Sequence, residues 1–259
     1  MVNASEDLIY DLKKRIIEGL RILVAEDVLY AAGHLSVRIP GTETFIINPR
    51  YPANIADIED LCIVDMKTCK RIAGPGPIPS ETHIHNEILK ARPDVQSVTH
   101  VHSRYATLFS LTDRPLIPFH NGAAAFRDGV GVVPSAEGVR TPEGGAEIAK
   151  HLGDKYACFQ RGHGVNIAGP GIEGTVMLAL NMERACHDAM LLAAAGQEPR
   201  PISFQGIFSA GEGESKEIRN RRLQNDYRTW PHLLQKHQLR PKDQIKRENK
   251  PAAEGGHVR

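Results

Sequence analysis

The run Val98-Thr99-His100-Val101-His102 constrains this chain more than any other stretch, because it joins a strand pattern to two side chains that bind metals. The run is short, rich in β-branched residues and followed by a helix start, as expected of a buried strand. Side chains alternate along a strand, so His100 and His102 point to the same face. They form either half of a metal site or a pair of hydrogen-bonded core histidines.

A second His-x-His pair, His83 and His85, lies in a different setting. Residues 81–92 have helical periodicity and end before Pro93, which indicates a helix. Positions two apart on a helix diverge by about 200°, so His83 and His85 cannot bind one ion together. His85 is instead expected one turn after Glu81 on the same helix face, where it can support a site from behind.

The composition favours a single large domain or two small ones, because the chain has 259 residues of which 41% are apolar. A net charge of +1 argues against charge-driven binding to nucleic acid or to an anionic membrane. We find no apolar run long enough to cross a bilayer and no signal-peptide pattern. Four cysteines without a Cys-x-x-Cys pair are typical of reduced thiols, so we expect a cytoplasmic protein.

Strand-like and helical segments mix without a strict strand–helix–strand repeat, which predicts a layered α/β domain with a mixed sheet. Ser5 is a candidate cap for a first helix that should reach about Ala32, where Gly33 fits a C-cap. Residues 116–119 are a further candidate for a short strand.

Three parts of the chain differ in composition. Residues 1–215 carry the periodic apolar pattern and are expected to form the catalytic domain. Residues 216–240 are charged and helical in pattern, which predicts a helical extension. Residues 241–259 are rich in Lys, Arg, Gly and Pro, so we expect a disordered, solvated basic tail. It lacks the interleaved aromatic residues that would favour nucleic-acid binding.

A catalytic metal site needs a third donor, and His163 is the best candidate. It stands between two glycines in Arg161-Gly162-His163-Gly164, a predicted turn where the backbone can come close to an ion. The alternative is a turn histidine whose side chain lies in solvent. Three neutral imidazoles with an open position are typical of catalytic zinc, although Mn²⁺, Fe²⁺ and Co²⁺ accept the same ligands.

Glu81 is the candidate acid or base. It follows residues 74–79, a stretch rich in Gly and Pro whose prolines favour a stiff segment that aims the next turn. A carboxylate at a helix start also complements the helix dipole, and this is the alternative role. Ser80 is expected to cap the helix, which leaves Glu81 available for chemistry.

These motifs together resemble the class II aldolase/adducin family, which includes fuculose-phosphate aldolase and ribulose-phosphate 4-epimerase. The resemblance covers about residues 8–196. It rests on ordered segments, namely 33–38, Ser80-Glu81, His100-x-His102, Arg161-Gly162-His163-Gly164 and Met182-Glu183-Arg184-Ala185 in a long helix.

The resemblance implies a three-layer α/β/α sandwich with a mixed central sheet. It also implies a homotetramer with C4 symmetry and active sites at the subunit interfaces. A divalent metal, Zn or Mn with Fe or Co as alternatives, would be held by His100, His102 and His163. Glu81 would serve as the acid/base.

Departures from the family's sugar-phosphate aldolases bear on the substrate. Those enzymes usually carry Asn where this chain has His34, a small Thr/Ser/Gly phosphate loop where it has Asn48-Pro49-Arg50, and a Ser-Ser pair where it has Pro79-Ser80. The changes remove donors from a phosphate cradle. Arg50 could bind a carboxylate with two hydrogen bonds, or it is an ordinary surface arginine.

His34 and Arg50 in this arrangement resemble the decarboxylase branch of the family, which acts on hydroxylated aromatic or pyridine dicarboxylates. His34 joins Glu81 as a candidate catalytic residue. The residues expected to contact the substrate are Arg50, Ser36, Asn48, Ser80 and His120.

The sequence therefore predicts a divalent-metal-dependent carbon–carbon lyase. A decarboxylase of a hydroxylated aromatic or pyridine carboxylate, active in aromatic degradation, is favoured. The main alternative is a class II aldolase that cleaves a hydroxy-keto or sugar-phosphate substrate. An oxygenase on the same triad would contain iron, and a non-catalytic adducin-like module would not need the intact triad. The expected partners are a small carboxylate substrate and further copies of the chain, without nucleic acid or membrane.

Overall fold

The computed structural model describes residues 4–30, 32–50, 56–202, 215–224 and 229–239. Their strands form one eight-stranded sheet in the order β4-β3-β2-β1-β5-β8-β7-β6. Only the β6–β7 pair is parallel, so the sheet is mixed, as the sequence predicts. The strands are β1 (Gly33–Arg38), β2 (Thr44–Ile47), β3 (Cys62–Asp65), β4 (Lys70–Ala73), β5 (Ser97–Val101), β6 (Gly131–Val133), β7 (Ala157–Gln160) and β8 (Gly164–Gly169).

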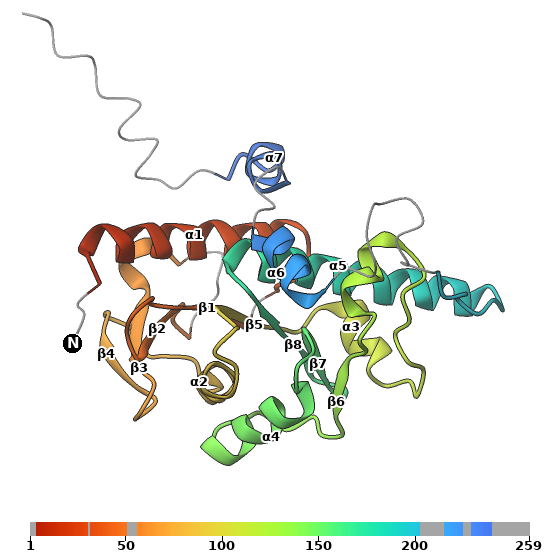
Figure 1. Cartoon of the computed structure of the whole chain (residues 1–259), viewed down its shortest axis with the longest axis horizontal. Helices are drawn as coiled ribbons and strands as arrows, with labels where there is room; N and C mark the ends of the chain where they lie inside the picture. Colours follow the sequence, from red (N-terminus) through yellow and green to blue (C-terminus); the bar gives the residue numbers. More distant parts are fainter. Residues whose placement is uncertain (1–3, 31, 51–55, 203–214, 225–228, 240–259) are drawn as a thin grey trace, which may run out of the picture.

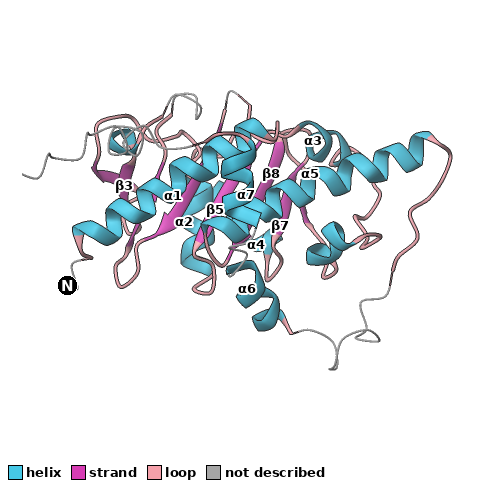
Figure 2. Ribbon diagram, turned by 90° about the horizontal axis from the view of Figure 1, so that it is seen from above, coloured by secondary structure: helices cyan, strands magenta, loops and turns pink. Residues whose placement is uncertain are grey.

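Helices cover both faces of this sheet (Figure 1). α1 and α5 lie over one face, and Figure 2 shows them from above, running across the strands. α2 and α4 pack together over the opposite face. The result is the predicted three-layer α/β/α sandwich. The helices are α1 (Glu6–Ala25), α2 (Thr82–Ala91), α3 (Arg104–Phe109), α4 (Pro142–Leu152), α5 (Ile172–Ala194), α6 (Lys216–Gln224) and α7 (Thr229–Lys236), with 3-10 turns at Ile58–Asp60 and Asn121–Phe126.

α1 begins as the sequence predicts and ends earlier. The Ser5 hydroxyl accepts a hydrogen bond from the Leu8 amide, so the predicted cap is confirmed. The helix stops at Ala25 instead of near Ala32, because Asp27 has a positive φ of 59° that leaves the helical path. Gly33 is the first residue of β1 rather than a C-cap, so that prediction is wrong.

Residues 116–119 do not join the sheet, which corrects the strand expected there. Pro115 and Pro118 flank or interrupt the run, and proline cannot donate to a strand ladder. The Pro118 carbonyl accepts a hydrogen bond from the Ile202 amide instead.

The predicted helical extension contains α6 and α7. α7 packs on α1 through Trp230, which is 7% exposed and donates its indole N–H to Glu18 Oε2 at 3.1 Å. The tail predicted at 241–259 lies outside the described residues, and the boundary at residue 215 stays a prediction. Among the described helices, none has the length and apolar character needed to span a membrane.

Candidate functional site

His100 and His102 meet where β5 ends. His100 is fully buried, and its Nε2 lies 2.9 Å from His102 Nε2. The outer nitrogens have carbonyl partners. His100 Nδ1 lies 2.7 Å from Asn166 Oδ1 on β8, and His102 Nδ1 lies 3.2 Å from the Ala32 carbonyl. Because the two imidazoles share one face of the strand, they converge on a single point, as the alternation predicts.

His163 reaches the same point from the turn between β7 and β8. Gly162 has a φ of +70°, which favours glycine. A Cβ on Gly164 would lie only 2.5 Å from the Val101 carbonyl oxygen, so the turn packs directly against β5. The His163 Nδ1 lies 2.8 Å from the Ala136 carbonyl. The two glycines therefore bring the third imidazole against the first two, and the rings of His102 and His163 are 4.8 Å apart.

The hydrogen bonds fix the chemistry of these rings. A carbonyl oxygen can only accept, so the Nδ1 atom of each ring carries a proton, and in the neutral form of each ring Nε2 presents a lone pair. Two bare nitrogens at 2.9 Å repel unless a cation lies between them. Imidazoles that donate their outer N–H to a carbonyl are typical of metal ligands. One ligand atom from each histidine and from Glu81 lies within 4.8 Å of the others. The donor set therefore fits a divalent metal ion.

Glu81 projects into this cluster from the start of α2. The helix begins at Thr82, with Glu81 at the N-cap position and without a side-chain cap, so the expected capping by Ser80 is wrong. The Glu81 carboxylate lies 3.7 Å from the Nε2 atoms of both His100 and His163. Its Oε1 accepts a hydrogen bond of 2.9 Å from the Val139 amide. The carboxylate is thus held at the cluster instead of on the helix end.

The electrostatics favour a cation between neutral imidazoles and a carboxylate. Burial raises the pKa of Glu81, but His163, His100 and the Val139 amide outweigh it and lower that pKa to about 2. Burial lowers the pKa of His100 to about 4. The hydrogen bond to Glu81 in turn raises the pKa of His163, as expected of a carboxylate next to a group that can carry positive charge.

His34 forms a second layer beside the cluster. It pairs with His100 across β1 and β5, and their rings stack with centroids 5.2 Å apart. Its Nε2 lies 3.9 Å from Glu81 Oε2. Its Nδ1 lies 2.7 Å from Nε2 of His85, which is fully buried. The sequence placed His85 behind the site but gave no indication of this contact.

The residues expected to bind substrate are not all gathered at the cluster. Ser36 is fully buried with its hydroxyl 2.7 Å from His85 Nδ1. Asn48 is also buried, and its amide bonds the backbone of Leu35, Gly33 and Pro49. Ser80 and Arg50 are exposed. Their substrate roles stay predictions, and the observed contacts of Ser36 and Asn48 are structural.

His120 lies away from the cluster. Its Nδ1 accepts a hydrogen bond from the Ala123 amide, its Nε2 lies 3.6 Å from Asp188 on α5, and its ring contacts Phe119. None of these described contacts joins the four clustered residues. A role for His120 in the pocket of this single chain has no support from the geometry.

Residues 134–140, which follow β6, are a part of the site that the sequence did not indicate. Ala136 and Val139 hold His163 and Glu81 through their backbone atoms. A Cβ on Gly138 would lie 3.5 Å from Glu81 Oε1 and 3.9 Å from Arg140 Nε. The exposed Arg140 side chain therefore borders the same space as Glu81. Only the folded chain could reveal it, because Arg140 belongs to no recognisable motif.

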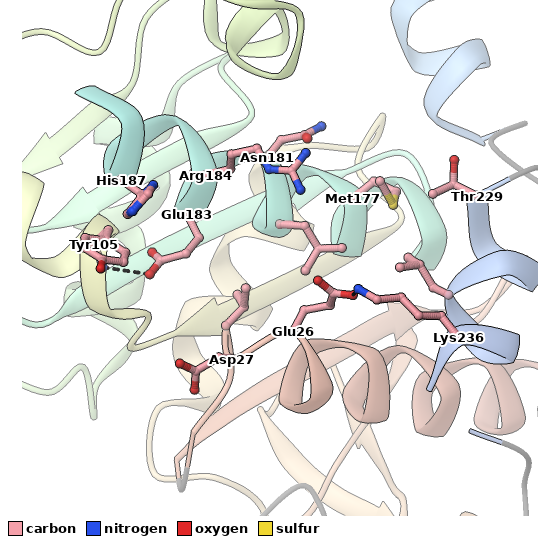
Figure 3. Close-up of a pocket in the computed structure, with 13 residues that line it drawn as sticks. Glu26, Asp27, Tyr105, Met177, Asn181, Glu183, Arg184, His187, Thr229 and Lys236 are labelled. Atoms are coloured by element: carbon pink, nitrogen blue, oxygen red, sulfur yellow. Dashed lines mark hydrogen bonds and ion pairs between the residues drawn. The ribbon is translucent and has the colours of Figure 1, made fainter. Parts of the chain in front are cut away.

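Glu183 on α5 is a second residue whose role the sequence missed. Its two carboxylate oxygens each accept a 2.8 Å hydrogen bond, one from Tyr105 N and one from Ala106 N. These amides belong to the first turn of α3, so Glu183 caps the helix and fixes the chain directly after His102. Figure 3 shows the contact between Tyr105 and Glu183 at one end of a cavity of about 390 Å³, which lies between α3, α5, α7 and the chain after α1. That cavity is not lined by any of the four clustered residues.

Comparison with known proteins agrees with this geometry. Residues 16–190 match the model of the class II aldolase and adducin N-terminal domain family. The meiotically up-regulated gene 14 protein of Schizosaccharomyces pombe is 34% identical over 63% of this chain and 65% of its own length. The chain therefore spans slightly less than two thirds of that relative.

Two further proteins carry names that describe a reaction. The 3,4-dihydroxyphthalate decarboxylase of Arthrobacter keyseri is 28% identical over 63% of this chain and 71% of its own. The solved structure of L-fuculose 1-phosphate aldolase from Glaciozyma antarctica PI12 is 27% identical with a TM-score of 0.72, covering 92% of this chain and 94% of the other.

Proposed function

The chain belongs to the class II aldolase and adducin family, and on that premise we propose that it is a divalent-metal-dependent decarboxylase of a hydroxylated aromatic or pyridine carboxylate. The convergence of His100, His102 and His163 with Glu81 is the observation that carries the lyase proposal. The decarboxylase name of the Arthrobacter relative supports the substrate class. Zn or Mn is the expected metal, with Fe or Co as alternatives.

A metal bound there would polarise substrate oxygens beside the bond that breaks. Ionised Glu81 takes the proton of the substrate hydroxyl and delivers it to the ring carbon that bears the carboxylate. The carbon–carbon bond then breaks, its electrons return to the ring, and CO₂ leaves. Solvent restores the hydroxyl proton. His34 faces the same space and is the alternative proton donor.

Arg50 is the proposed ligand for a substrate carboxylate, since a guanidinium can bind it with two hydrogen bonds. Arg140 is a competing cation, favoured by its place beside Glu81. Separate Arg50→Gln and Arg140→Gln variants distinguish them. The arginine that binds the carboxylate should raise KM by about tenfold when replaced, with little change in kcat. Arg161→Gln is a matched control, because its guanidinium already pairs with Asp113.

The proposal is tested by metal-reconstituted protein and a panel of dihydroxylated phthalates, pyridine dicarboxylates and sugar phosphates. Metal-dependent CO₂ release from an aromatic acid, lost in Glu81→Gln, supports it. Release of an aldehyde from a sugar phosphate without any CO₂ would identify an aldolase instead. That second candidate is favoured by the likeness to the fuculose-phosphate aldolase structure.

Two less favoured candidates have their own signatures. An oxygenase on the same triad would purify with iron and consume O₂. A non-catalytic module would keep its function after His100→Ala or His163→Ala. The cytoplasmic location and the part in aromatic degradation belong to the decarboxylase proposal and stay predictions.

A homotetramer with active sites at subunit interfaces is part of the proposal. Exposed apolar side chains beside the site support it, because Leu108 and Leu111 are 42% and 57% exposed and Leu111 contacts the turn at Gly162. Surface leucines in such a patch are typical of protein contacts. Light scattering would give the mass of the assembly. Leu111→Arg should reduce that mass and the activity together, and a chain that is a monomer at all concentrations would contradict the tetramer.

A further inference from the structure

Three side chains form a buried hydrogen-bonded line that ends at the candidate active site. Ser36 Oγ lies 2.7 Å from His85 Nδ1, and His85 Nε2 lies 2.7 Å from His34 Nδ1. Ser36 and His85 are fully buried, and His34 is 6% exposed. The line joins β1 to α2 and leaves one atom facing the cluster, His34 Nε2, at 3.9 Å from Glu81.

Both rings in this line are buried among hydrogen-bonding partners. The 2.7 Å contact between His85 Nε2 and His34 Nδ1 needs one nitrogen that donates and one that accepts. A neutral imidazole meets this need, because it carries one proton and so donates from one nitrogen and accepts at the other. The direction of the line therefore decides whether His34 presents an N–H or a lone pair to the substrate.

The Glu81 end determines that direction. The Ser36 hydroxyl fits either one, because it can donate to His85 Nδ1 at 2.7 Å, or accept from that nitrogen and donate to the Val98 carbonyl at 3.4 Å. At the other end, the Glu81 carboxylate faces His34 Nε2 at 3.9 Å, and a carboxylate attracts an N–H and repels a lone pair. The Glu81 end therefore favours donation from Ser36 to His85, from His85 to His34, and from His34 into the site.

The geometry points to His85 as a positioning residue that holds His34 in the single tautomer with its proton on Nε2. His34 then serves as a neutral hydrogen-bond donor from a fixed direction, beside the stacked ring of His100. A group bound there must accept a hydrogen bond, as the carboxylate or the developing oxyanion of an aromatic acid does. The assignment of an aromatic acid as the ligand rests on the proposed function, whereas the assignment of the His34 tautomer is independent of it.

Two conservative variants of His85 separate positioning from packing. In His85→Gln the side-chain amide reaches about as far as Nε2, so it can still donate to His34. In His85→Asn the amide lies near the Nδ1 position, beside Ser36, and cannot reach His34. Both replace the ring by a neutral amide. A purely structural role predicts similar losses from the two variants, and positioning predicts a difference.

The test uses the full-length, zinc-loaded protein with ¹⁵N-labelled histidine, because NMR distinguishes a protonated ring nitrogen from a bare one. His34→Gln identifies the His34 signals. We expect the proton on His34 Nε2 in the native protein and in His85→Gln, and a mixture of both tautomers in His85→Asn. We expect kcat to fall about 10- to 100-fold in His85→Asn and much less in His85→Gln, with metal content unchanged in both.

A His34 proton on Nδ1 in the native protein would overturn the inference, whatever reaction is catalysed. Equal losses of kcat and thermal stability in both variants, with the His34 tautomer unchanged, would also overturn it. The expected tautomers without CO₂ release from any aromatic acid would uphold the positioning role and refute the proposed function.

Discussion

The two faces of the central sheet are built from the same strands, but one face packs an apolar core and the other carries the candidate site. β1 sends Leu35 and Val37 into the core under α1 and α5. The alternate residues, His34 and Ser36, face α2 and reach His85. Under α1 and α5 the buried layer is mainly apolar. Under α2 and α4 an apolar cluster that includes Phe45 and Val98 gives way to histidine and serine side chains toward the site.

The contrast teaches how a buried polar site is tolerated. Alternation along a strand lets one segment serve a core on one side and a site on the other. Burial of apolar surface under α1 and α5 provides stability, while the polar groups under α2 hydrogen-bond to one another, which limits their desolvation cost. We therefore expect stability and chemistry to respond to different substitutions.

The largest expected effect is on the polar face. His163→Ala removes one of the convergent imidazoles and should lower the activity by about 1000-fold or more, with loss of the bound metal. Metal analysis and turnover with the best substrate give the readout. His151→Ala, on a surface histidine paired with Glu147, is the control. Full activity in His163→Ala would show that the activity does not depend on a metal held by His163.

Leu20→Ala tests the apolar face. Leu20 is fully buried on α1, and such a truncation should cost about 2–5 kcal/mol of unfolding free energy. Urea unfolding measures it, and the folded fraction should still bind metal. Leu191, on α5, is 56% exposed, so Leu191→Ala should change stability by less than about 0.5 kcal/mol. If Leu20→Ala lost the metal without a loss of stability, the apolar face would also be needed for metal binding, and the expected separation of stability from chemistry would be wrong.

Glu183→Gln sharpens the comparison, because Glu183 belongs to the apolar side yet fixes the turn after His102. Loss of one strong acceptor at the start of α3 should cost about 1 kcal/mol and weaken metal binding by about tenfold. Isothermal titration with zinc measures the affinity. Glu147→Gln, on the exposed face of α4, should leave it unaltered. Unchanged affinity in Glu183→Gln would show that the turn holds His102 without this cap.

The smallest effect near neutral pH comes from the buried histidines themselves. The pKa of His85 is about 3 in the folded chain and about 6.5 when unfolded. Between these values the unfolded chain binds more protons, so stability is complete above about pH 6.5 and declines as the pH falls toward 3. Thermal melts of the metal-free protein from pH 7 to 4 follow the decline. In His85→Gln the melting temperature should fall less steeply as the pH is lowered. An unchanged pH dependence would mean that groups other than His85 cause the decline.

Much of this site could be predicted because its signals are local. The alternation at His100 and His102 and the glycines around His163 each act over a few residues, and both placements agree with the structure. The divergence of His83 from His85 is also local, and only His85 faces the site. The boundary of α1 could not be predicted in this way, because the positive φ at Asp27 has no signature stronger than the apolar pattern that continues past it.

The contacts that only the tertiary structure decided are those between distant segments. α2 packs on β5, the neighbour of β1, and this brings His85 to His34, 51 residues away along the chain. Arg140 borders the space around Glu81 because it follows a loop held by a backbone hydrogen bond to Glu81. The amino-acid sequence by itself determined which residues can bind a metal, since ligand type and strand periodicity are properties of short segments. Packing decided their partners and tautomers, because a hydrogen bond between distant segments depends on how helices and strands are placed to within a fraction of an ångström.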